Sequence, residues 1–240
     1  MKEQIKQQLK EHYCYKTELH VHSSPGSKCS RLSVGEIVDR YVAHGYDAVV
    51  LTNHFMYDYF EGMTKDEAID FYYRDYNDMC ALGEKYGLKI LLGSEVRFTE
   101  NMNDYLIYGV DRSVLGKVYD YFTKGVEVFR NEVKLKDSVF IQAHPFRDPC
   151  VPVDAALLDG VEVFNLHPHH NSRIGMAALY AKENNKTLAT AGSDLHYPDK
   201  GHSGTSAMRT TVLPKDSFEL AQIMKSGDYL LEIGNNIILS

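Results

Sequence analysis

The sequence predicts an α/β protein, folded as a barrel or a doubly wound sheet, and three observations support this. Apolar segments of strand length alternate with longer helical segments along the chain. Segments such as 48–51 (AVVL) and 89–92 (KILL) are apolar on both faces, which is typical of parallel strands covered by helices. The length of 240 residues suits one large α/β domain. We therefore expect residues 1–240 to form a single domain.

The expected elements follow from apolar segments for strands and from capping signals for helices. Ser33 and Glu36 form a capping-box pattern, while Gly45, Gly87 and Gly227 stand where helices should end. The polar stretch 1–16 is also helix-prone. The expected strands are Thr17–His22, Tyr46–Thr52, Leu88–Glu95, Asp104–Gly109, Ser138–Ala143, Gly160–Asn165, Thr187–Gly192, Ala207–Leu213 and Tyr229–Ile233. The expected helices are Val34–Ala43, Thr64–Tyr86, Ser113–Val133, Arg173–Asn184 and Lys215–Ser226.

Composition excludes several classes of protein. With 26 basic and 33 acidic residues the net charge is −7, which argues against a protein that grips long nucleic acids or a polybasic membrane surface. No stretch resembles a signal peptide or a membrane-spanning helix. The four cysteines form no CxxC pair and are interpreted as free thiols in a reducing compartment. We expect a cytoplasmic protein; the sequence does not indicate its oligomeric state.

The unusual feature of the composition is 11 histidines, and several of them stand at the ends of expected strands. In either α/β architecture, functional residues belong at the carboxyl ends of strands. A single histidine or acid there is more often structural, but a whole set at one end of a sheet indicates a shared metal site. The candidate ligands are His20, His22, His54, Glu95, Asp111, His144, Asp194 and His196.

These ligand types limit the chemistry of the site. Imidazole and carboxylate without thiolate suit zinc, manganese or iron. The set is too large for one tetrahedral ion, so we expect two or three divalent ions, which suit hydrolysis of a phosphate ester. A phosphate also needs cationic and polar contacts, and guanidinium groups match its oxygens. The candidate phosphate contacts are Arg97, Arg147, Asn165, His170 and Arg173.

The order of motifs HxH, TxH, GxE, HP, ExxN and SDxH resembles the PHP family, the polymerase and histidinol phosphatase superfamily, over about residues 16–211. This resemblance implies a distorted (β/α)7 TIM-like barrel with a two- or three-metal centre at the carboxyl face of its strands. Carried over by position, it implies a first ion held by His20, His22, Glu95 and Asp194, a second by Glu95, His144 and Asp111, and a third by His54 and His196.

Two departures from the family pattern fall around the third ion. The loop after the HxH motif, residues 23–29, contains no acid or histidine, where many members have one. Asn53 replaces the usual aspartate before His54. Cys29 is interpreted as a small buried thiol rather than a ligand. We therefore expect two firmly bound ions and a third that is weak, absent or bound only with phosphate.

The resemblance and the residues together predict a metal-dependent phosphoesterase that hydrolyses a small phosphorylated substrate through metal-bound hydroxide. Asp194, His54 and His196 are the expected catalytic residues, and either histidine would protonate the leaving alkoxide if it does not bind metal. Alternatives within the family are a histidinol-phosphate or tyrosine-phosphate phosphatase and a nucleotide or oligonucleotide phosphodiesterase. A metal-binding regulatory module with a decayed active site is the alternative outside enzymes.

Overall fold

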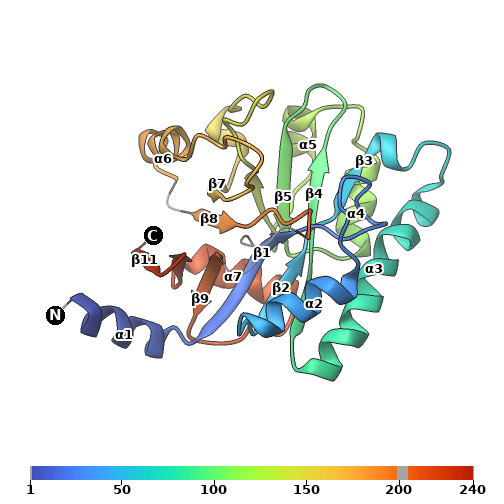
Figure 1. The fold of residues 1–240 in the computed structure, drawn as a ribbon. Helices are drawn as coiled ribbons and strands as arrows, with labels where there is room; N and C mark the ends of the chain where they lie inside the picture. The colour runs from blue at the N-terminus through green and yellow to red at the C-terminus, as the bar shows by residue number, and fades with distance from the viewer. Residues whose placement is uncertain (1, 187, 199–204, 240) are drawn as a thin grey trace.

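The computed structural model describes residues 2–186, 188–198 and 205–239, and its centre is one curled mixed sheet (Figure 1). Along the sheet the strands run in the order β11-β10-β9-β1-β2-β4-β5-β6-β7-β8, and β3 pairs with β4. The expected strand start at Thr187 and the histidine at position 202 lie outside the described residues. The strands are β1 (Tyr15–Val21), β2 (Ala48–Leu51), β3 (His54–Met56), β4 (Lys89–Arg97), β5 (Asp104–Tyr108), β6 (Val139–Gln142), β7 (Gly160–Asn165), β8 (Ala189–Gly192), β9 (Ser206–Thr210), β10 (Leu230–Ile233) and β11 (Asn236–Leu239).

The directions of the strands make the sheet a curled half-barrel. Strands β1, β2 and β4 are parallel, as are β6, β7 and β8, but β5 runs antiparallel between the two groups. The segment after β8 returns to β1, where Asp194 N donates to His20 O at 2.9 Å and His22 N donates to Leu195 O at 3.1 Å. The structure confirms a mixed α/β fold. It does not confirm a regular (β/α)7 repeat, because β4 leads into β5 without a helix.

Helices α2 to α6 lie around the outside of the curled sheet, α7 packs against one end of the curl, and α1 projects from the body at the blue end of the chain (Figure 1). The expected helix 113–133 is two helices, because the chain turns after Tyr119 and Gly125 takes a left-handed φ of 85° at the start of the second. None of the described helices is long and apolar enough to cross a membrane. The α-helices are α1 (Lys2–His12), α2 (Val34–Ala43), α3 (Lys65–Tyr86), α4 (Arg112–Tyr119), α5 (Val126–Glu132), α6 (Ile174–Glu183) and α7 (Ser217–Ser226), and the 3-10 helices are η1 (Tyr57–Tyr59) and η2 (Ala155–Leu157).

Apolar side chains from different strands meet inside the curl and are covered at one end by α7. The hydroxyl of Ser217, the first residue of α7, accepts hydrogen bonds from Gly109 N and Val110 N at the end of β5. This helix therefore closes the end of the curl away from the carboxyl ends of the parallel strands. The buried cluster includes Leu19, Val50, Leu91, Leu106, Ile141, Ala191, Leu220 and Met224.

The amino terminus of α2 has the predicted capping box, in which Ser33 Oγ accepts from Glu36 N and Glu36 Oε2 accepts from Ser33 N. Replacing Ser33 by Ala leaves one of the helix's first N–H groups without its acceptor. We expect Ser33→Ala to lower the free energy of unfolding by about 1 kcal/mol, measured by urea denaturation. The exposed Ser113, inside α4, is the matched control, and S113A should change stability by less than about 0.5 kcal/mol. Equal losses in both variants would show that the cap contributes nothing.

Candidate metal centre

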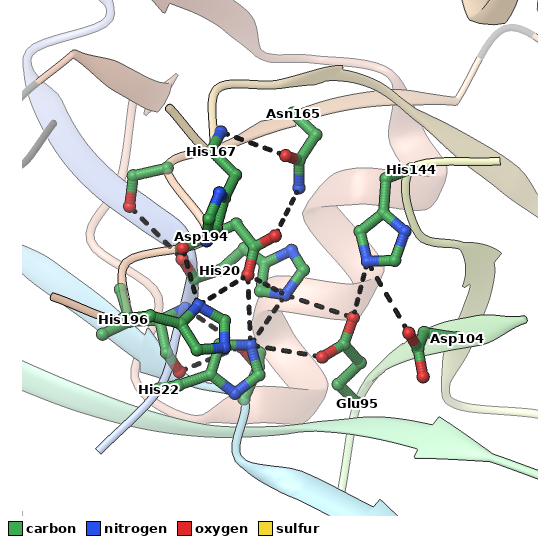
Figure 2. A network of polar contacts seen from close by, with 12 residues as sticks. His20, His22, Glu95, Asp104, His144, Asn165, His167, Asp194 and His196 are labelled. Carbon is green, nitrogen blue, oxygen red and sulfur yellow. Dashed lines mark hydrogen bonds and ion pairs between the residues drawn. The ribbon is translucent and has the colours of Figure 1, made fainter. Parts of the chain in front are cut away.

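Four of the predicted ligands come from neighbouring strands at one end of the sheet. His20 lies in β1 and His22 directly after it, while His54 begins β3. Glu95 lies in β4 and is the register partner of His54. Each of the four residues is at most 8% exposed. Figure 2 shows the side chains of His20, His22 and Glu95 pointing toward one another.

Glu95 lies among four imidazoles. Its Oε1 is 3.1 Å from His144 Nε2 and 3.4 Å from His20 Nε2. Its Oε2 is 3.0 Å from His54 Nδ1 and 3.2 Å from His22 Nε2. A carboxylate with both oxygens facing ligand nitrogens is suited to bridge two cations.

Asp194 supplies the second carboxylate of the cluster. Its Oδ1 is 3.4 Å from His22 Nε2, 3.5 Å from His20 Nε2 and 3.2 Å from His196 Nδ1. Its backbone has a φ of 52°, and that of His144 has a φ of 29°. Residues other than glycine adopt positive φ angles uncommonly, and such conformations often occur at functional sites. The strain therefore supports a functional role for both residues.

Mutual attraction fixes the charges of the two carboxylates. Burial by itself would raise the pKa of both groups, but the imidazoles around Glu95 hold its pKa well below its usual range, by the charge of His20 and the hydrogen bond with His144 among others. His20 and Arg147 do the same for the pKa of Asp194. Both groups are therefore ionised near neutral pH and available as metal ligands.

The surroundings shift the pKa values of the imidazoles in opposite directions. Burial dominates at His54 and holds its pKa well below the usual value. At His144 the hydrogen bonds to Cys150 and to the central carboxylate outweigh burial and raise the pKa to about 10. At His196 the charge of Asp194 outweighs burial and raises the pKa to about 11. A cation that binds His144 or His196 must displace a proton from the imidazole, so metal affinity falls as pH falls.

The donor set fits divalent cations. Among the described residues, several groups of three have ligand atoms within 4.8 Å of one another. Each of the five groups contains imidazole and four contain a carboxylate, donors that suit zinc, manganese and iron, while one also includes the thiol of Cys150. His54 Nδ1 is buried with no hydrogen-bond partner among those residues, although Glu95 lies beside it. The groups are His20–His22–Glu95, His22–His54–His196, His54–Glu95–Asp104, His167–Asp194–His196 and Asp104–His144–Cys150.

The assignment of Asp111 to the centre is corrected by the structure. Asp111 caps α4, where its carboxylate accepts from Val114 N at 2.8 Å, at the far end of β5. Because β5 is antiparallel, its first residue rather than its last lies at the site. That residue is Asp104, which pairs with Arg97 at 2.8 and 2.7 Å and lies 3.8 Å from His144 Nε2. Burial, and then the charge of Glu95, raise the pKa of Asp104.

A buried carboxylate not included among the candidate residues supports the ligands from behind. Glu162 in β7 is 1% exposed, and its Oε1 is 2.7 Å from His20 Nδ1. Its Oε2 accepts from His144 N at 3.0 Å and from Asn165 Nδ2 at 2.9 Å. The contact with Nδ1 orients His20 so that Nε2 faces Glu95 and Asp194, an arrangement common behind metal-binding histidines.

We expect Glu162→Gln to weaken metal affinity by about 10- to 100-fold, because the neutral amide no longer fixes and polarises His20. Competition with a chelating dye measures this affinity. Glu183 is exposed near the end of α6, and E183Q is the matched control. An E162Q variant with the affinity of the unmodified chain would show that Glu162 only fills space.

Glu18 links β1, which carries His20, to the segment after β8, which carries Asp194. This fully buried carboxylate accepts from Leu19 N, His20 N and Ser193 N at 3.0, 3.1 and 3.0 Å. The strands pack closely at Gly192, where an added Cβ would lie 2.4 Å from the Cβ of His20. A larger residue at this position would displace a candidate ligand.

The cavity beside the cluster brings some of the predicted phosphate contacts together. Its volume is about 170 Å³, and its lining includes the predicted contacts Arg97, Arg147 and His170. His167, which is not among the predicted contacts, also lines it. Arg147 Nη2 donates to Asp194 Oδ2 at 2.7 Å, while its Nε is buried with no partner among the described residues. A buried, unsatisfied guanidinium N–H is suited to a ligand oxygen.

The other two predicted phosphate contacts lie outside the lining of the cavity. Asn165 is buried behind it, with Nδ2 donating to Asp194 Oδ2 at 3.1 Å and Oδ1 accepting from Arg147. Arg173 pairs with Asp148 and with the backbone oxygen of Phe146. Asn165 therefore positions side chains of the site, and Arg173 fixes the loop after β6.

The loop after β1 also differs from its expected state. Asn53 accepts from Ser23 N at 2.8 Å and from Ser27 Oγ at 3.0 Å, so the amide orders this loop. Cys29 is half-buried rather than buried, and it lines the cavity with its Sγ 3.1 Å from His196 Nε2. The thiol is thus part of the wall of the site.

Comparisons with known proteins agree with the motif pattern. The PHP domain family model matches residues 18–235, which extends the resemblance beyond residue 211. No curated protein matches the sequence.

Solved structures show the same fold at low sequence identity. A two-domain protein from Bacteroides vulgatus ATCC 8482, described as containing a predicted PHP-like metal-dependent phosphoesterase, aligns with a TM-score of 0.65 and 17% identity. The alignment covers 93% of this chain but only 66%, just under two thirds, of that one. A protein from Bifidobacterium adolescentis ATCC 15703, described as a metal-dependent phosphoesterase, again as a prediction, aligns with a TM-score of 0.51 and 15% identity over 87% of this chain and 95% of that one.

Proposed function

Because the chain belongs to the PHP domain family, we propose that it is a metal-dependent phosphoesterase acting on a small phosphorylated substrate. The observation that carries the proposal is the buried cluster of imidazoles around Glu95 and Asp194, next to a cavity lined by Arg97 and Arg147. Two or three divalent ions, zinc, manganese or iron, are the proposed cofactors. Ions in such a site supply a nucleophile at neutral pH and Lewis-acid stabilisation of phosphoryl oxygens.

The ligand nitrogens and oxygens divide into overlapping sets. His20, His22, Asp194 and Glu95 would hold one ion. Glu95 also lies beside His144 and would contribute to a second ion there. Asp104 would complete the side of the cluster that contains His144. His54 and His196 would hold the third ion. Each of these side chains is at most 8% exposed, which suits a pre-organised centre.

The arginines bind and orient the phosphate. Arg147 lines the cavity and has a buried Nε with no partner among the described residues, while its pairing with Asp194 keeps the guanidinium in place. Arg97 is held by two hydrogen bonds to Asp104, so its charge stands at the cavity wall at low entropic cost. His170 is exposed at the same cavity and can donate to a phosphate oxygen.

The size of the cavity supports a small substrate. At about 170 Å³ it is smaller than the roughly 300–1,000 Å³ of sites that enclose drug-sized ligands, so it suits the phosphate rather than a whole large molecule. A groove of about 200 Å³ shares Arg97 with it and is lined by Tyr57, Phe98 and Met102 among others. This groove is the proposed location of the leaving group.

The test uses the chain stripped of metal with a chelator and then supplied with manganese or zinc. We expect p-nitrophenyl phosphate to be hydrolysed only after metal is restored, and the diester bis-p-nitrophenyl phosphate shows whether diesters are also substrates. A panel of phosphorylated metabolites then narrows the substrate. A folded, metal-loaded chain that hydrolyses none of these would indicate the regulatory metal-binding module instead.

A further inference from the structure

We propose that Cys29 is a thiolate ligand in the metal centre and that, with His54 and His196, it forms a distinct sulfur-containing subsite. This inference rests on the proposed function, because it assigns a role within the same centre. Cys29 Sγ lies 3.1 Å from His196 Nε2, and Cys29, His54 and His196 all line the same cavity.

The backbone around Cys29 holds the thiol in this position. Ser30 Oγ donates to the backbone oxygens of His22 and His196 at 2.8 and 3.3 Å. Arg31 N donates to His196 O at 2.8 Å. The stretch directly after Cys29 is therefore tied to the strand ends that carry His22 and His196. These bonds hold the backbone of Cys29 beside the strand end that carries His196.

His54, the third member of the subsite, has a ring nitrogen without a hydrogen-bond partner among the described residues. His54 is 8% exposed, and its Nδ1 lies 3.0 Å from Glu95 Oε2 without the geometry of a hydrogen bond, so the atom is unsatisfied among the described residues. Tyr59, whose ring centroid is 5.8 Å from that of His54, places its hydroxyl 3.9 Å from Cys29 Sγ. Cys29 and His54 therefore face the same aromatic side chain at the cavity wall.

The chemistry of this donor set differs from that of the rest of the centre. Two imidazoles and one thiolate resemble the three-ligand arrangement of catalytic zinc sites, which leave a fourth position open. A softer sulfur donor favours zinc over manganese, whereas the carboxylate-rich positions accept both. The loop that lacks an acid or a histidine thus still supplies a ligand, and the third ion need not be weak.

Cobalt provides a direct test, because only a sulfur ligand gives a thiolate-to-cobalt charge-transfer absorption in the near ultraviolet. The chelator-treated chain is titrated with Co²⁺, with Cys29→Ser as the main variant and Cys150→Ser as the control for the second thiol near the cluster. We expect the absorption in the unmodified chain and in C150S. In C29S it should be absent, with about one equivalent less cobalt bound.

Two further measurements separate coordination from a structural effect. Cys29→His should restore the bound cobalt without the thiolate absorption. In the unmodified chain, mass spectrometry should find Cys29 alkylated by iodoacetamide only when metal is absent. An absorption that keeps its full strength in C29S, or a cobalt-loaded chain that hydrolyses phosphate esters without the absorption, overturns the inference and leaves the proposed function intact. A chain that binds no cobalt refutes both.

Discussion

Replacing Glu95 by Gln should lower kcat for phosphate-ester hydrolysis by at least about 1,000-fold, corresponding to several kcal/mol of lost transition-state stabilisation. Glu95 lies within 3.4 Å of four imidazole nitrogens, so the substitution removes the charge that holds the cluster together. The amide keeps the volume of the side chain, which limits the effect on packing. Steady-state kinetics and elemental analysis of the same preparation measure both consequences.

The control for this variant is Glu84→Gln, because Glu84 is exposed in the last turn of α3, which leads into the opposite end of β4 from Glu95. E84Q should keep both its metal and its activity. An E95Q variant that binds as much metal as the unmodified chain and hydrolyses substrate at the same rate would show that Glu95 is not part of the metal centre.

Replacing Arg147 by Met should lower kcat/KM by about 100- to 1,000-fold, because the buried guanidinium is the candidate group for stabilising charge on the phosphoryl oxygens. In contrast to E95Q, this variant should retain its metal, since Asp194 still contacts His196 and Asn165. Inorganic phosphate should become a weaker inhibitor. These readouts distinguish loss of phosphate binding from loss of the centre.

Arg112→Met is the matched control, because Arg112 forms an exposed ion pair with Asp70 at 2.6 Å. R112M should leave kcat/KM and phosphate inhibition unchanged. If R147M instead lost its metal while phosphate inhibition per active site stayed the same, Arg147 would be a support for Asp194 and not a phosphate ligand.

The direction of one strand explains the largest difference between the sequence prediction and the structure. A parallel connection needs a crossover of a dozen or more residues, and the stretch 98–103 between β4 and β5 is too short for one. That length was the available signal that β5 is antiparallel and that Asp104, not Asp111, faces the site. The ends of the parallel strands were predictable because apolar runs identify them directly.

Other features depend on tertiary contacts that local patterns do not encode. Glu162 is an acid inside an otherwise apolar strand, a signal of a buried partner, but its contact with His20 joins residues 142 positions apart. Cys29 meets His196 only because the loop folds back onto both ligand-bearing strand ends. The capping box of α2 was readable because all of its partners lie within one helical turn.

The most direct test of the metal-dependent mechanism is a titration of the chelator-stripped chain with manganese or zinc, following bound metal by elemental analysis and turnover of p-nitrophenyl phosphate in the same samples. The account predicts no turnover in the stripped chain and activity that rises with the metal bound to the centre. Hydrolysis that persists without metal, or a fully loaded and folded chain that never turns over any phosphate ester, would contradict it.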